Sequence, residues 1–80
     1  MPTALRKNGY RFYFVMFDLN EPMHVHVDKQ GKTAKVWLSP VQVARNYGYR
    51  AQELNEIESI INERLQQLIS VWNDEKAKLA

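Results

Sequence analysis

The chain has 80 residues, of which 45% are hydrophobic and 25% charged, and its formal net charge is +2. This length and composition are typical of one small globular domain, and they exclude a disordered tail or a membrane segment. The chain has no cysteine, so disulfides and thiolate metal ligands are excluded, which fits a reducing cytoplasm. The net charge is too small to indicate nucleic-acid binding, so any electrostatic argument depends on where the charges lie.

The N-terminus has no apolar signal-peptide core, and no apolar run approaches the roughly 20 residues that a membrane-spanning helix needs. We therefore expect a cytoplasmic protein without membrane contact. A core this small gives only modest stability without a partner, so we also expect a homo-oligomer or a hetero-complex.

The first half of the chain predicts two hairpins. Asn8-Gly9 is the strongest short signal for a two-residue turn, because both residues tolerate the positive φ of a type I′ turn. Residues 5–7 and 10 to about 17 are the expected arms. The predicted pairs are Lys7 with Tyr10, Arg6 with Arg11, Leu5 with Phe12, and Ala4 with Tyr13.

A second two-residue turn at Gln30-Gly31 predicts the other hairpin. Alternate residues of a strand point to opposite faces, so a core that takes Val25 and Val27 places the two histidines together on the other face. A register error of one residue would bury that polar set. The predicted pairs are Lys29 with Lys32, Asp28 with Thr33, Val27 with Ala34, His26 with Lys35, Val25 with Val36, and His24 with Trp37.

The second half of the chain predicts helices. Ser39-Pro40-Val41-Gln42 has the pattern of a capping box with proline in the first turn, so we expect a short helix over residues 40–47 that stops at Gly48. A longer helix is expected from about Ala51, because apolar residues recur at spacings of three and four. Residues 74–80 are expected to fray. The apolar stripe of the long helix consists of Leu54, Ile57, Ile61, Leu65, Leu68 and Trp72.

These elements predict a single α+β domain over residues 1–80. A four-stranded, mostly antiparallel sheet of two hairpins packs on one long C-terminal helix, which a short helix precedes. The covered face carries Leu5, Phe12, Phe14, Met16, Val25, Val27, Val36 and Leu38. The other face is expected to be a binding surface or a dimer contact, because it places large side chains among the charges. Those side chains are Tyr13, Val15, Phe17 and Trp37.

The basic groups of this second face predict phosphate binding. Arg6 and Arg11 lie opposite each other, and like charges directly across a strand pair repel unless an anion lies with them. Lys35 lies beside His26, and arginine forks match phosphate oxygens well. The candidate phosphate-binding or RNA-binding residues are Arg6, Arg11, Lys35 and Tyr13.

Two imidazoles in such a cradle titrate near neutral pH, so they are candidates for the acid and base that cleave an RNA phosphodiester through its 2′-hydroxyl. Lys35 or an arginine would stabilise the charge that develops on the phosphorane. Glu21, just before the strand, would orient an imidazole or act as base. The candidate catalytic residues are therefore His24, His26 and Glu21, in a ribonuclease-type reaction without a cofactor.

Other interpretations of the same residues stay open. The two histidines could be solvent-exposed side chains of the strand with no catalytic role. A different turn register would leave both arginines facing water. His24 and His26 are also suited to zinc or another transition metal, with Asp28 or Glu21 as a third ligand, although no second His or Cys cluster completes a tetrahedral site. The alternative function is a non-enzymatic module whose aromatic face recruits a protein partner.

Four segments of the chain are distinctive: Pro2-Thr3, Gly9-Tyr10-Arg11-Phe12, Glu21-Pro22-Met23-His24-Val25-His26-Val27 and Ala44-Arg45-Asn46-Tyr47-Gly48-Tyr49. Over nearly the whole chain, they are similar to the small bacterial family catalogued as domain of unknown function 4160. The resemblance implies a toxin-like protein whose antitoxin-like partner is a second small protein, domain of unknown function 2442. It carries over to Glu21, His24 and His26 as signature positions.

The chain departs from the pattern of similar sequences at two positions. Arg50 stands where a small capping residue, commonly serine, is usual, which removes a helix cap worth about 1 kcal/mol. Met23 stands where a proline is frequent, so the backbone before His24 is less restricted. Together, the residues and the resemblance predict a toxin component that acts on RNA or on translation at the ribosome.

Overall fold

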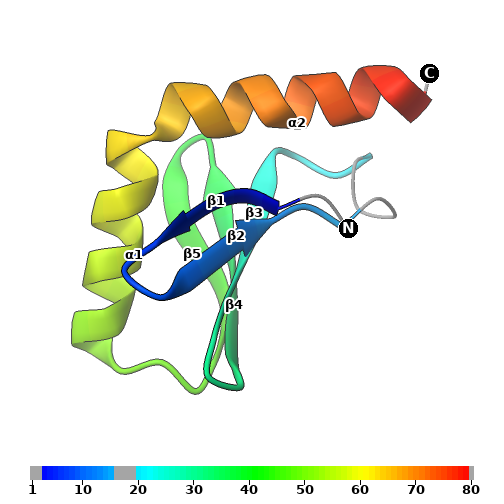
Figure 1. Cartoon of the computed structure of the whole chain (residues 1–80). Helices are drawn as coiled ribbons and strands as arrows, with labels where there is room; N and C mark the ends of the chain where they lie inside the picture. The colour runs from blue at the N-terminus through cyan, green and yellow to red at the C-terminus, as the bar shows by residue number, and fades with distance from the viewer. Residues whose placement is uncertain (1–2, 16–19, 80) are drawn as a thin grey trace.

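The computed structural model of the chain describes residues 3–15 and 20–79, which form an antiparallel five-stranded sheet and two helices (Figure 1). The sheet order is the chain order, β1-β2-β3-β4-β5. The α+β class is confirmed, whereas the expected four strands and single long helix are wrong. The elements are β1 (Thr3–Lys7), β2 (Tyr10–Tyr13), β3 (His24–Lys29), β4 (Lys32–Leu38), β5 (Val41–Tyr47), α1 (Ala51–Glu63) and α2 (Leu65–Leu79).

Both predicted turns form hairpins. In the β3–β4 hairpin every predicted pair is present, and in the β1–β2 hairpin three pairs are as predicted. Thr3, not Ala4, lies opposite Tyr13, because a β-bulge between Thr3 and Leu5 adds one residue to β1. The strand β2 ends at Tyr13, earlier than expected. Met16 and Phe17, which were expected on the two faces of this arm, lie outside the described residues.

The segment predicted as a short helix over residues 40–47 is the strand β5. Ser39 and Pro40, joined by a cis peptide bond, form the turn that leads into it. Val41 pairs with Leu38 and Val43 with Val36, so both valines lie half-buried against the core. The capping-box pattern is a local signal, and β4 offers backbone hydrogen bonds and an apolar surface that suit β-branched residues better.

The helix expected from Ala51 begins there, but it breaks at Arg64 (φ −112°, ψ 22°). Neither proline nor glycine occurs at the break, so the local sequence does not predict it. The helix α2 then continues to Leu79, which corrects the expected fraying from Asp74. Among the described residues, no helix is long and apolar enough to cross a membrane.

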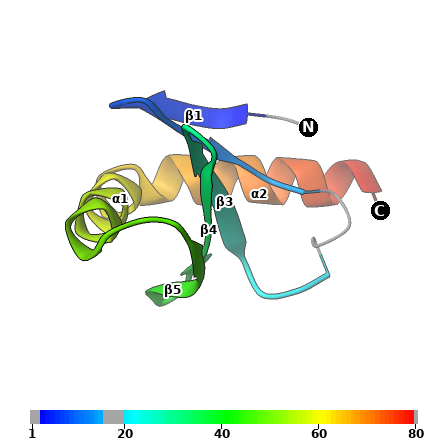
Figure 2. The ribbon, with the colours of Figure 1, turned by 90° about the horizontal axis from the view of Figure 1, so that it is seen from below.

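The break lets the two helices meet the sheet differently (Figures 1 and 2). The helix α1 lies beside one face, here called the inner face, which carries Val25, Val27 and Val36. The helix α2 runs across the strand ends and continues past the sheet. The buried core contains Tyr10, Phe12, Phe14, Val25, Val27, Ala34, Val36, Leu38, Tyr49, Ile57, Ile60, Ile61, Leu68 and Trp72.

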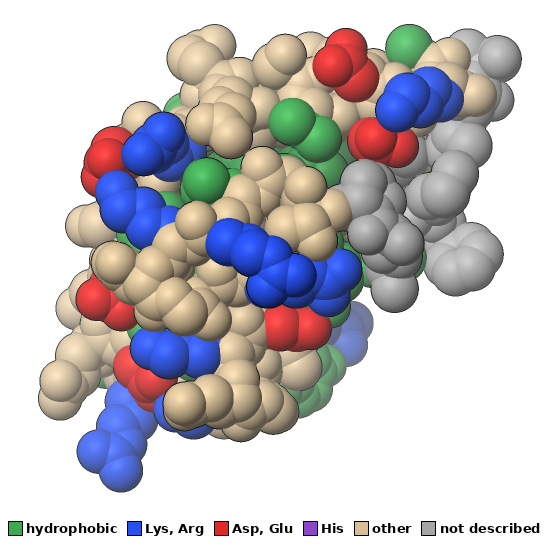
Figure 3. Space-filling view, in the orientation of Figure 1, with side chains coloured by type: hydrophobic (Ala, Val, Ile, Leu, Met, Phe, Trp, Pro, Cys, Tyr) green, Lys and Arg blue, Asp and Glu red, His purple; other side chains and the backbone are tan. Residues whose placement is uncertain are grey.

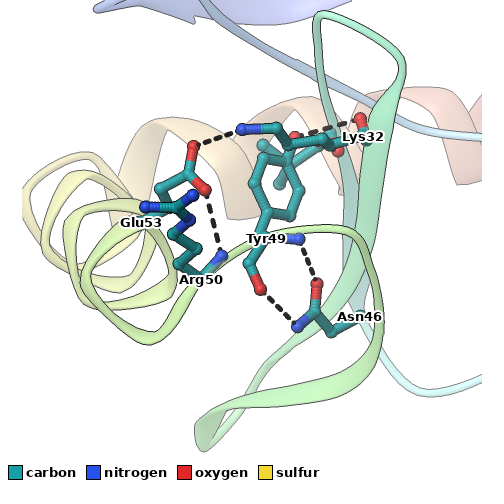
Figure 4. A network of polar contacts seen from close by, with 6 residues as sticks. Lys32, Asn46, Tyr49, Arg50 and Glu53 are labelled. Atoms are coloured by element: carbon teal, nitrogen blue, oxygen red, sulfur yellow. Dashed lines mark hydrogen bonds and ion pairs between the residues drawn. The ribbon is translucent and has the colours of Figure 1, made fainter.

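Side-chain hydrogen bonds fix the junction between β5 and α1 (Figure 4). The Asn46 amide accepts from the Tyr49 backbone N–H at 3.0 Å and donates to the Tyr49 carbonyl at 2.9 Å. The buried Tyr49 hydroxyl lies 2.9 Å from the Val27 carbonyl and 3.2 Å from the Lys32 carbonyl. The junction segment is therefore tied to both strands of the central hairpin.

A carboxylate replaces the cap that Arg50 lacks. Glu53 accepts from the Arg50 backbone N–H at 3.0 Å and from the Lys32 ammonium at 2.9 Å. This contact supplies the reciprocal half of a capping box. The Arg50 N–H, followed by Lys32, lowers the pKa of Glu53 below its ordinary value of 4.5.

We predict that Tyr49→Phe lowers the free energy of unfolding by about 1–2 kcal/mol, because the Val27 and Lys32 carbonyls lose the hydroxyl that they share. Urea unfolding measures the loss. The matched control is Tyr47→Phe, whose hydroxyl lies at the surface and which we expect to change stability by less than about 0.5 kcal/mol. Equal losses in the two variants would contradict the structural role of Tyr49.

The lowered pKa of Glu53 predicts a pH dependence. The folded state favours the ionised carboxylate, so its contribution to stability is present above pH 4.5 and is lost as the pH falls through the lower folded value. Urea unfolding as a function of pH should show a smaller acid-side loss for Glu53→Gln than for the wild type. Lys32→Gln should change this loss in the same direction. An unchanged acid profile in both variants would exclude the contact as its source.

Candidate functional site

The outer face, opposite α1, arranges its side chains in rows that cross the sheet. The register of the four strand pairs defines these rows, and neighbouring strands lie about 4.8 Å apart. The central row contains Thr3, Tyr13, His26, Lys35 and Arg45, and the adjacent row contains Arg6, Arg11, Asp28, Thr33 and Tyr47. These two rows hold all four residues that the sequence predicts to bind phosphate, Arg6, Arg11, Lys35 and Tyr13.

The two histidines share the outer face, as strand parity predicts, but only one of them is accessible. Their rings lie 5.2 Å apart. His24 is 1% exposed, with its ring 5.6 Å from Trp37 and 5.3 Å from Trp72, whereas His26 is half-buried. The expected exposure of both imidazoles is therefore wrong for His24.

The path of α2 explains this burial. His24 begins β3 at the strand end that α2 crosses (Figure 2), and the ring of Trp72 from α2 lies against its imidazole. The His24 Nδ1 donates to the Pro22 carbonyl at 2.9 Å, because a carbonyl only accepts. In this arrangement the imidazole is a packing group of the core, out of reach of a ligand on the outer face.

The aromatic ring of Tyr13 links the basic residues to His26. The rings of Tyr13 and His26 are stacked, with centroids 5.5 Å apart and an interplanar angle of 25°. The Arg11 Cζ lies 4.6 Å from the centroid of the Tyr13 ring, and the Arg11 Nε donates to the Thr3 hydroxyl at 2.9 Å. These contacts hold the guanidinium in one orientation before any ligand binds.

Asp28 completes this cluster. The Tyr13 hydroxyl donates to the Asp28 carboxylate at 3.1 Å. Burial, followed by the charge of Asp28, raises the pKa of Tyr13 above its ordinary value, so the phenol stays protonated. Asp28 was a candidate third metal ligand, but its carboxylate accepts from this hydroxyl. Within residues 3–15 and 20–79, no three His, Asp or Glu side chains are grouped to hold a metal ion.

Two pairs of like charges lie across the outer face. Arg6 is opposite Arg11, as predicted, and Lys35 is opposite Arg45. The second pair was missed because Arg45 was assigned to a helix. The signal that could have found it is the alternation Val41-x-Val43, which favours a strand.

Glu21 lies with the second pair of cations. It was expected to orient an imidazole or to act as base, but its carboxylate lies 2.7 Å from the Lys35 ammonium. Lys35 also lies 4.8 Å from the centroid of the Trp37 ring. Glu21 therefore neutralises a cation of the face that was predicted to bind phosphate.

The basic groups are also visible at the surface over the first hairpin. In Figure 3, Lys and Arg side chains gather in the middle of the view, where Figure 1 places β1 and β2. These strands contribute Arg6, Lys7 and Arg11. Lys7 is paired with Glu63 of α1 at 3.0 Å, which leaves Arg6 and Arg11 as the cations that this hairpin contributes to the outer face.

Comparison with known proteins gives one match. A family model described as "Domain of unknown function (DUF4160)" matches residues 9–73. No curated protein and no solved structure is similar to the chain. The matched range extends from the first turn into α2, so it includes the outer-face strands β2 to β5.

We predict that His24→Ala and His26→Ala differ in their effect on stability. Truncation of His24 leaves a cavity beneath Trp72 and should lower the free energy of unfolding by about 2 kcal/mol or more. Truncation of the half-buried His26 should cost less than about 1 kcal/mol. Urea unfolding of the two variants measures this difference, and a larger loss for His26 would contradict the packing role of His24.

Proposed function

The chain belongs to the family Domain of unknown function (DUF4160), and from this premise and the outer face we propose that it is the toxin-like component of a bacterial two-protein module and binds RNA. The observation that carries the proposal is the presence of two like-charge pairs on one sheet face, Arg6 with Arg11 and Lys35 with Arg45. The proposed place of action is RNA or the ribosome in the cytoplasm.

Electrostatics supports an anionic ligand. Cations directly opposite each other in a sheet repel, and a phosphate between them converts that repulsion into attraction. Arg11 is held by Thr3 and by the ring of Tyr13, so little side-chain freedom remains to be lost when it binds. An arginine fork in a fixed position is suited to two oxygens of one phosphate.

Aromatic side chains support a single-stranded ligand. Tyr47 is 56% exposed at the end of the row that contains both arginines, and Arg45 donates to its hydroxyl at 3.3 Å. Proteins that bind single strands combine a basic surface with rings on which unpaired bases stack. The outer face has both features.

The proposal is RNA binding rather than cleavage by a pair of imidazoles. A general acid or base has to lie within hydrogen-bond reach of the proton that it transfers, and His24 is covered by Trp72. Of the two histidines, His26 is the one that a bound phosphate can approach. The antitoxin-like partner would then act by covering the basic rows of the outer face.

A second function is favoured by a specific observation. Each of three outer-face cations already has a partner within the chain: Arg11 has Thr3, Lys35 has Glu21, and Arg45 has Tyr47. A face whose cations already have partners within the chain also suits a protein-interaction module, in which Tyr47 and its neighbours contact the partner. Under that function the chain binds its partner and not RNA.

Fluorescence anisotropy with a labelled single-stranded RNA of about 12 nucleotides tests the first function. The double variant Arg6→Gln/Arg11→Gln should bind at least about tenfold more weakly, and the slope of log affinity against log salt should fall by about 1.4, because two phosphate contacts are lost. The control Lys76→Gln/Lys78→Gln removes the same charge from α2 and should bind like the wild type.

Two results would contradict this function. If the control weakens binding as much as the outer-face variant, the attraction depends on net charge alone. If the wild type binds no RNA but binds its antitoxin-like partner, and the outer-face variant weakens that complex, the interaction module is the correct function.

A further inference from the structure

A β-bulge turns Arg45 toward the outer face. Val43 faces the core opposite Val36, and residues two apart on a regular strand share a face, so a regular β5 would point Arg45 inward as well. The register shifts between Lys35 and Val36, which adds Ala44 to β5 and places Arg45 opposite Lys35. The two cations are therefore brought together by an irregularity of the strand, at the cost of regular pairing.

Glu21 contacts Lys35, one member of this pair, as an anionic ligand would. Its carboxylate lies 2.7 Å from the Lys35 ammonium, and the side chains of Lys35 and Glu21 are 17% and 41% exposed. The hydrogen bond to Tyr47 is the largest cause that raises the pKa of Arg45 above its ordinary value, and the attraction of Glu21 is the smallest. A carboxylate and a phosphate accept from the same donors.

The first pair of cations differs from the second in this respect. Among the ion pairs within residues 3–15 and 20–79, none joins Arg6 or Arg11 to a carboxylate, whereas Lys35 is joined to Glu21. The two pairs lie on the same face, with β3 between Arg11 on β2 and Lys35 on β4. Two strand spacings of about 4.8 Å separate these strands, so a short single strand would reach both pairs.

We infer that Lys35 and Arg45 form a second phosphate subsite, which the Glu21 carboxylate occupies in the ligand-free protein and leaves when a phosphate of a bound RNA enters. This inference rests on the proposed RNA binding and adds to it a residue, Arg45, and an internal competitor, Glu21. It gives Glu21 a role opposite to that of a catalytic base, because loss of the carboxylate strengthens binding.

The test uses Glu21→Gln in the full chain, with Glu58→Gln on α1 as a control that changes the net charge equally. Anisotropy with the same single-stranded RNA should show binding about three- to tenfold tighter for Glu21→Gln and a salt slope steeper by about 0.7, the value for one more phosphate contact. Glu58→Gln should bind like the wild type. Adding Arg45→Gln to Glu21→Gln should remove the gain.

A structural role for the Glu21–Lys35 contact gives a different result. In that case Glu21→Gln lowers the free energy of unfolding but binds RNA no more tightly than Glu58→Gln, and the inference is overturned. Urea unfolding of each variant identifies this case and confirms that the protein in the binding assay is folded.

Inorganic phosphate separates this inference from the proposed function. If no variant binds RNA, the proposed function fails, and the subsite is tested alone by following the amide NMR signals of Lys35 and Arg45 during a phosphate titration. Larger shifts in Glu21→Gln than in Glu58→Gln support the subsite. Equal shifts in the two variants overturn it.

Discussion

The register between β3 and β4, fixed by the two-residue turn at Gln30-Gly31, is the constraint on which the rest of the structure depends. It directs Val25 and Val27 into the core against α1, and it places His26 beside Lys35 on the opposite face. A slip of one residue would turn the core side chains of one of the two strands to the opposite face. The core and the candidate site therefore lie on the two faces of the same pair of strands, and a change of register would alter both.

The outer face is not uniformly open, because α2 covers one end of it. Trp72 lies against Phe14 of the core and also against His24, with ring centroids 5.5 Å and 5.3 Å apart. One side chain thus closes the core at the strand ends and buries the first histidine. The remaining rows, which contain His26 and the two cation pairs, are the part of the face on which a ligand can act.

Both edge strands of the sheet contain a β-bulge, one in β1 after Thr3 and one in β5 at Ala44. Bulged edges pair poorly with other strands, which protects a small sheet from edge-to-edge association. The β1 edge also meets α2, where Gln67 donates to the Ala4 carbonyl at 3.4 Å. In β5 the bulge has a second effect, because it places Arg45 on the outer face. The same bulge therefore protects the sheet edge and adds a cation to the outer face.

Sequence signals that act within a few residues were sufficient to predict the two hairpins. The turns at Asn8-Gly9 and Gln30-Gly31 and the alternation of Val25 and Val27 fix the pairing, and hence the Arg6–Arg11 and His26–Lys35 neighbours. The same kind of signal failed for residues 40–47, because a capping pattern is overridden when the edge of β4 is available for pairing. It also could not place the break at Arg64, where no residue type marks a change of direction.

Strand parity and turn chemistry are local, so the amino-acid sequence alone predicts which residues alternate on β3 and β4 and which charges lie opposite each other in the first hairpin. Only the tertiary structure decided that β5 joins the sheet, that Trp72 buries His24, and that Glu21 neutralises Lys35. Those outcomes depend on contacts between segments that lie far apart in the chain. The packing energy of such contacts exceeds the local helix and strand preferences on which a prediction from sequence is based.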